Sequence, residues 1–153
     1  MRRTAKQALC SIVGMLMLLL AAGLAACSGG AATRTEAPAQ VGAGVEVLYF
    51  YGKQRCATCV AIERGAQTAV ETLFADALKD GRLAYRAIDV STPEGEAVAD
   101  RYEVSWSSLV LVKHGKDGGE TAENLTKFAF ATARSYPEDF RSGLAEKITR
   151  LLE

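Results

Sequence analysis

The stretch VEVLYFYGKQRCATC, residues 45–59, holds the strongest structural signal in this chain. Its first half, residues 45–51, is a nearly continuous run of β-branched and aromatic residues, which is typical of a buried central strand. A four-residue turn then leads to Cys56 and Cys59. From these cysteines onward, apolar residues recur at steps of three and four. The sequence therefore predicts a single helix over residues 56–79.

The two cysteines stand at the predicted start of this helix. Three residues apart, they lie about one helical turn from each other, close enough to form a disulfide. The helix N-terminus offers unpaired N–H groups and a partial positive charge, and both favour the thiolate of Cys56. Cys59 falls on the apolar helix face with Ile62 and Ala66, so it should be buried and poorly reactive. A strand that delivers such a pair to a helix start predicts thiol–disulfide exchange chemistry.

Strand and helix signals alternate along the rest of the chain. The predicted elements are a strand over 82–90, a short helix from about 91 to 102, a strand over 109–112, a hairpin turn at 116–119, an edge strand over 120–125 and a last helix from Pro137. The short helix has a start signal, since Ser91 stands three residues before Glu94 and Pro93 falls in the first turn. The first three strands are expected to be joined by right-handed crossovers, and a hairpin should add the fourth.

This order of elements, with a Cys-x-x-Cys sequence after the first strand, resembles the thioredoxin fold over residues 45–153. The resemblance implies an α/β protein of three layers, whose mixed sheet has about four strands and is covered by three to four helices. It also implies a redox-active disulfide, in which Cys56 is the attacking cysteine and Cys59 the resolving one.

Three positions depart from the thioredoxin pattern. Ser107, preceded by Trp106, stands where the family has a cis-proline facing the active site. Because a cis bond without proline costs about 3–4 kcal/mol, a trans bond is expected there, with the Ser107 hydroxyl presented to the site. Phe50 stands six residues before Cys56, where thioredoxins have a buried acid that relays protons. Arg55 replaces the tryptophan that usually precedes the first cysteine.

Three further side chains near the cysteines bear on the chemistry of the site. Arg55 is expected on an exposed turn, with its guanidinium close to the Cys56 sulfur, where it would favour the thiolate. Trp106 is either a core residue or an aromatic wall beside the cysteines. Glu63, one turn after Cys59, is either exposed helix surface or a weak candidate for a proton acceptor.

The N-terminus predicts export and anchoring. Residues 1–26 have a basic start and a long apolar stretch, as in a secretory signal peptide. Their end, Leu24-Ala25-Ala26-Cys27, resembles the lipobox of bacterial lipoproteins, which implies lipid modification (palmitate) of Cys27 as the first mature residue. The alternative is a transmembrane anchor. Residues 27–44 then form a flexible linker rich in small residues, and residues 45–153 form the folded domain.

Charge and cysteine content narrow the function further. The chain has 18 basic and 18 acidic residues and no basic stripe, so no nucleic-acid partner is expected. Cys10 leaves with the signal peptide and Cys27 carries lipid, so Cys56 and Cys59 can pair only with each other in a compartment where disulfides persist. His114, the single histidine, is expected at the surface near the hairpin. No metal and no cofactor is therefore predicted.

These observations lead to two hypotheses. The first is a membrane-anchored thiol–disulfide oxidoreductase of the cell envelope, facing the periplasm or exterior and more often acting as a reductase. Its partners would be protein or small thiol and disulfide substrates, with a membrane electron donor possible. The second is a redox-inactive binding lipoprotein of thioredoxin fold, in which a structural Cys56–Cys59 disulfide shapes a partner-binding loop.

Overall fold

The computed structural model describes residues 42–153. The predicted signal peptide, the predicted lipidation site Cys27 and nearly all of the predicted linker lie outside the described residues. No helix within 42–153 is long and apolar enough to cross a membrane.

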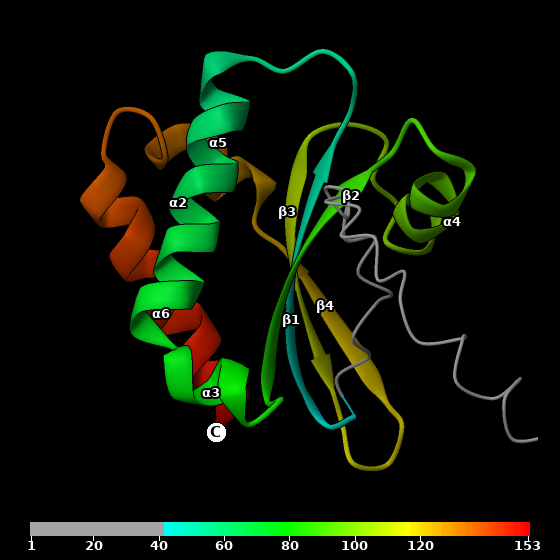
Figure 1. Cartoon of the computed structure of the whole chain (residues 1–153), viewed down its shortest axis with the longest axis vertical. Coiled ribbons are helices and arrows are strands. Elements are labelled where there is room, and N and C mark those ends of the chain that lie inside the picture. The colour runs from blue at the N-terminus through cyan, green and yellow to red at the C-terminus, as the bar shows by residue number, and fades with distance from the viewer. Residues whose placement is uncertain (1–41) are drawn as a thin grey trace, which may run out of the picture. The chain divides into compact units, whose positions relative to one another are not determined.

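The described chain forms one four-stranded mixed sheet with five helices (Figure 1). Strand order is β2-β1-β3-β4; β1 runs parallel to β2 and antiparallel to β3, and β4 runs antiparallel to β3. The elements are β1 (Gly44–Tyr51), α2 (Ala57–Leu73), α3 (Ala75–Lys79), β2 (Leu83–Asp89), α4 (Pro93–Arg101), β3 (Ser108–His114), β4 (Glu120–Asn124), α5 (Thr126–Thr132) and α6 (Pro137–Leu152).

Helices cover both faces of the sheet, which gives the three layers expected from the sequence. Figure 1 shows α2 and α6 together on one face and α4 on the other. The core is correspondingly divided in two. The larger cluster includes Val45, Val47 and Tyr49 of β1, whereas the smaller one, under α4, includes Leu48 and Phe50. Successive residues of a strand point to opposite faces, so β1 is buried on both sides and is the central strand that its apolar run predicted.

The third strand runs in the opposite direction to the one expected. A crossover would have made it parallel to the first two strands, but β3 is antiparallel to β1. The short connecting helix explains this. The nine residues of α4 span about 13 Å, whereas the seven residues of β2 span about 23 Å. Helix α4 therefore cannot return the chain to the far end of the sheet, and β3 starts at the end where β2 finishes.

Two helix predictions also differ from the structure. The single helix over 56–79 is broken at Phe74, whose φ of −129° and ψ of 30° lie outside the helical region, and Phe74 packs against the larger core cluster. Helix α5 was not predicted, because its seven residues are too few for a periodic signal. The side chain that caps α4 is that of Thr92, which accepts a hydrogen bond from Gly95 N at 3.1 Å, and not that of Ser91.

The other boundaries follow the sequence closely. The end of α3 is a Schellman-type C-cap at Gly81, with φ of +69°. The hairpin between β3 and β4 and the start of the last helix at Pro137 are confirmed.

Candidate functional site

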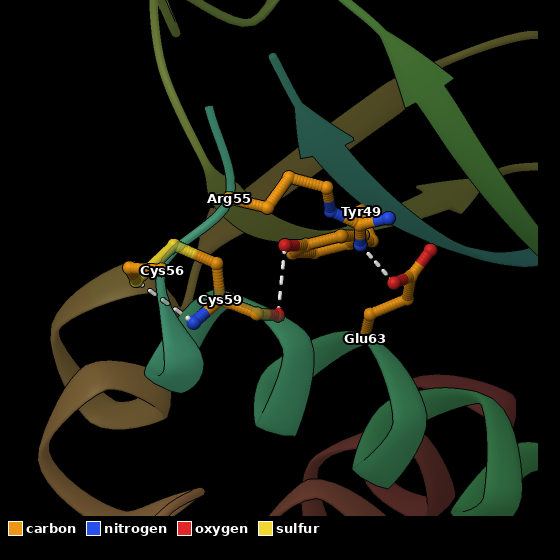
Figure 2. Close-up of a disulfide and its surroundings, with 5 residues drawn as sticks. All are labelled: Tyr49, Arg55, Cys56, Cys59 and Glu63. Atoms are coloured by element: carbon orange, nitrogen blue, oxygen red, sulfur yellow. Dashed lines mark hydrogen bonds and ion pairs between the residues drawn. A yellow bond between two sulfur atoms is a disulfide. The ribbon is translucent and has the colours of Figure 1, made fainter. Parts of the chain in front are cut away.

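Cys56 and Cys59 form a disulfide at the N-terminus of α2 (Figure 2). Cys56 is the N-cap residue, and its sulfur accepts a hydrogen bond from Cys59 N at 3.0 Å. The two Cα atoms are 5.0 Å apart. Cys56 is exposed, whereas Cys59 is only 6% exposed. Solvent and partners therefore reach one sulfur, while the other lies against the core, as the helical pattern predicted.

An open groove of about 580 Å³ adjoins the disulfide. Both cysteines line it, together with residues from three loops and from α5: Gly52, Gln54, Arg55, Val90, Ser105, Trp106, Ser107 and Phe130. The Trp106 ring is 58% exposed, and its centroid lies 5.2 Å from that of Phe130. Of the two interpretations of Trp106, the structure supports the aromatic wall and not the core residue.

Ser107 lies in this groove beside both cysteines, at the position where thioredoxins have cis-proline. No cis peptide bond occurs within residues 42–153, as expected for serine there. Ser107 is 6% exposed, and its side chain is near enough to the Tyr49 hydroxyl to offset part of the rise that burial causes in the pKa of Tyr49. Its hydroxyl thus belongs to the wall of the site.

Tyr49, which the sequence analysis missed, lies directly beneath the disulfide. Its hydroxyl donates a hydrogen bond to the Cys59 carbonyl oxygen at 2.8 Å (Figure 2). Burial raises the pKa of Tyr49, and hydrogen bonds from Arg55 and Ser107 offset part of that rise. Tyr49 is therefore neutral at physiological pH and acts as a donor. Phe50, the residue counted into the position of the family's buried acid, points to the opposite face of the sheet, into the cluster under α4.

The expected placement of Arg55 beside the Cys56 sulfur is wrong. Figure 2 shows its side chain extending away from the disulfide, over the Tyr49 ring toward Glu63. The guanidinium lies 4.8 Å from the Tyr51 ring centroid and forms an ion pair with the Glu63 carboxylate. Burial alone would lower the pKa of Arg55, but its hydrogen bonds to Glu63 and Tyr49 make the net shift upward. Because Glu63 is held in this pair, it is not the free helix-surface residue expected.

His114 lies at the end of β3 farthest from the disulfide, since its register partner is Gly44 at the start of β1. It is half-buried, and its Nε2 lies 3.2 Å from the buried Glu46 carboxylate and its Nδ1 3.7 Å from that of Glu120. In the part of the chain that the structure describes, no group of three or more His, Cys, Asp or Glu side chains is arranged to hold a metal ion.

Comparisons with known proteins bear on this fold. No protein-family model and no curated protein matches the chain, but solved structures do. A thioredoxin from Thermus thermophilus is 19% identical, covering 68% of this chain and 73% of that chain with a TM-score of 0.43. Trxlp from Edwardsiella tarda is also 19% identical, covering 69% and 86% with a TM-score of 0.44. Human ERp44 in its zinc-bound form is 16% identical with a TM-score of 0.50, covering 73% of this chain but only 27% of that chain.

The ERp44 likeness covers 73% of this chain, and the described residues form the mixed four-stranded sheet that the resemblance implied. The fold is thioredoxin-like. At these identities the likeness establishes the fold and nothing about substrates. The thioredoxin-like fold here supplies a helix N-terminus carrying a disulfide, a groove beside it and a loop with Ser107 across from it.

Proposed function

We propose that this protein is a membrane-anchored, extracytoplasmic thiol–disulfide oxidoreductase that acts mainly as a reductase. One observation carries the proposal. The Cys56–Cys59 disulfide stands at the N-terminus of α2 with Cys56 exposed to an open groove and Cys59 buried behind it. Attack and resolution require this asymmetry, because the accessible sulfur must meet the substrate while the second waits behind it. A disulfide that only stabilises the fold has no need of a groove.

The reaction begins from the reduced protein. The Cys56 thiolate, favoured by the helix N-terminus, attacks one sulfur of a substrate disulfide, and the substrate's other sulfur leaves as a thiolate. A mixed disulfide now joins Cys56 to the substrate. Cys59 loses its proton and attacks the Cys56 sulfur, which releases the second substrate thiolate and forms the Cys56–Cys59 disulfide. Two electrons pass to the substrate, and a dithiol donor from the membrane must return them for another turnover.

Reduction of insulin tests the activity. With dithiothreitol as electron source, the wild-type full chain is expected to accelerate precipitation of the insulin B chain, because each cycle passes electrons through Cys56. The Cys56→Ser variant should show only the background rate. Equal rates for the two proteins would sink the enzymatic function.

A trapping experiment tests the roles of the two cysteines. Cys59→Ser removes the resolving thiol, so substrates should accumulate as disulfide adducts on Cys56, detectable on a non-reducing gel. Cys56→Ser is the matched control and should trap little, because Cys59 is buried. Adducts on Cys59 in the control, with none on Cys56 in the trap, would reverse the assigned roles.

The second candidate is a redox-inactive binding lipoprotein with a structural disulfide. Two observations favour it: Phe50 leaves the site without a buried acid, and Trp106 offers an exposed aromatic surface to a partner. A glutathione redox titration separates the candidates. A structural disulfide has a reduction potential below about −300 mV and stays oxidised throughout such a titration, whereas oxidoreductases titrate between about −120 and −270 mV.

Anchoring is proposed from the lipobox resemblance of residues 24–27 and is tested separately. In a bacterial host fed labelled palmitate, the wild-type chain should carry label and fractionate with membranes. Cys27→Ser should lose the label. Retention of label by this variant would refute lipidation at Cys27.

A further inference from the structure

The groove beside the disulfide is unusually poor in charge. Of the residues that line it, only Arg55 is charged, and its guanidinium is turned toward α2 rather than toward the exposed sulfur (Figure 2). Arg55 is the residue immediately before Cys56, so its flexible side chain starts next to the sulfur that it avoids. A cation so close to a thiolate would stabilise it. The question is what holds the cation elsewhere.

Two kinds of contact restrain the guanidinium. It lies over the Tyr49 and Tyr51 rings, 6.0 and 4.8 Å from their centroids, and it forms the ion pair with Glu63 on α2. The cation–π contact is a weak restraint at a partly exposed site. The ion pair is the directional one, because the carboxylate offers two acceptor oxygens to the planar guanidinium. Glu63 is itself half-buried and is fixed on a regular helix, so it is a firm anchor.

We propose that Glu63 is a positioning residue that holds the Arg55 guanidinium over Tyr51 and away from the Cys56 sulfur, and so limits how strongly the protein stabilises the Cys56 thiolate. The stabilisation left to Cys56 then comes mainly from the N-terminus of α2. When Glu63 is removed, Arg55 is free to turn toward the thiolate.

Glu63 acts mostly through Arg55 and little through its own charge. Glu63 lies seven positions after Cys56 in the sequence, a distance of about 10 Å along the helix axis. This exceeds the screening length of about 8 Å at physiological ionic strength. The other ionisable groups around this end of the sheet are Lys53 in the turn, Asp89 at the end of β2, and the tyrosines Tyr49, Tyr51 and Tyr85. Lys53 and Arg55 both act electrostatically on Asp89. When Arg55 moves, Lys53 and Asp89 keep their positions, so the change in electrostatic potential at Cys56 comes from Arg55.

The test measures the acidity of Cys56 in the reduced full chain. Iodoacetamide alkylation is followed against pH, and peptide mass spectrometry counts the adduct on Cys56 alone. Glu63→Gln is expected to lower the titration midpoint by up to about 0.7 unit, the size set by an exposed charge contact. At a pH well below the midpoint this gives up to about fivefold more thiolate. The reduction potential should become less negative, because the reduced form is stabilised.

Two comparisons make the test specific to positioning. Glu71→Gln removes the same charge from an exposed site two turns farther along α2, where Glu71 accepts a hydrogen bond from Gln67, and it should leave the midpoint unchanged. In an Arg55→Ala background, Glu63→Gln should shift the midpoint much less than in the wild type, since the cation that it frees is gone. Equal shifts in the two backgrounds, or no shift in the wild type, would overturn the positioning role.

The positioning role of Glu63 depends on the proposed function only where it is expected to affect catalytic turnover. Thiol acidity is measured without any substrate, so its outcome is independent of the insulin assay. A Glu63→Gln shift in a protein that fails to reduce insulin would refute the enzyme and leave the positioning role standing.

Discussion

The hydrogen bond from Tyr49 to the Cys59 carbonyl fastens the helix that carries the disulfide to the central strand. Replacing Tyr49 by Phe deletes one oxygen from a fully buried side chain and leaves the ring in place. The lost contact is the 2.8 Å hydrogen bond to the Cys59 carbonyl oxygen. The change is small in volume, so its effect on stability reports hydrogen bonding rather than packing.

The expected loss of unfolding free energy follows from the hydrogen bonds that remain after the substitution. The Cys59 carbonyl lies in the first turn of α2, so it keeps the backbone amide four residues on as a partner. The cost is therefore that of a typical intramolecular hydrogen bond, about 1 kcal/mol, and not that of an orphaned buried group. At about 2.1 cal/mol/K per residue over the domain, 1 kcal/mol lowers Tm by about 4 °C.

Thermal unfolding of the oxidised full chain, followed by circular dichroism, measures the difference. Tyr51→Phe is the matched control: Tyr51 lies two residues along the same face of β1, and the described residues offer its hydroxyl no hydrogen-bond partner. It should change stability by less than about 0.5 kcal/mol. If Tyr49→Phe unfolds at the same temperature as Tyr51→Phe, the hydroxyl does not fasten the helix and the reasoning fails.

Two further predictions concern stability elsewhere in the domain. Gly95→Ala should destabilise by about 1–3 kcal/mol, because its Cβ would lie 1.9 Å from the Asp89 carbonyl oxygen, whereas Gly52→Ala, with a nearest contact of 3.8 Å, should not; urea unfolding midpoints compare the two. The Lys147 hydrogen bond lowers the pKa of Glu123 below its ordinary 4.5, so this carboxylate stabilises the fold above that pH and loses its contribution as the pH falls through the lowered value. Glu123→Gln should therefore unfold at lower urea than wild type at pH 7, and the difference should shrink as the pH falls through the lowered pKa; a constant difference would contradict the assignment.

The sequence was most informative where a local pattern determines the structure. The burial of β1, the disulfide at the start of α2 and the apolar face of α6 each follow from the spacing of side chains within one element. The direction of β3 did not follow in the same way, because it depends on whether the length of α4 matches the strands beside it. Strand direction is set by the lengths of the connecting segments, and the boundaries of these segments are harder to predict from sequence than the presence of the elements that they join.

The sequence predicted residues that line the site, but it did not predict the contacts that their side chains make. Both cysteines and Ser107 meet at one groove, as the resemblance implied, and Trp106 lines the same groove, which is one of its two interpretations. The partner of Arg55 was not predictable, since a long side chain beside a thiolate has several charges within reach. Arg55 pairs with Glu63 because Glu63 lies on the face of α2 that packs over the tyrosines of β1. That position depends on how α2 packs across the strand.

The residue beneath the disulfide is Tyr49, whereas the sequence count pointed to Phe50, and this difference affects the mechanism. Counting six residues back from Cys56 reaches Phe50, but the count crosses a turn whose length varies between proteins. Strand alternation is fixed: Val45, Val47 and Tyr49 share the face that packs under α2. The residue beneath Cys59 is thus a phenol, which burial keeps protonated at neutral pH. It donates a hydrogen bond but cannot accept the Cys59 proton, so that proton must leave through solvent in the groove. Resolution of the mixed disulfide should therefore be the step of the proposed cycle that depends most on pH.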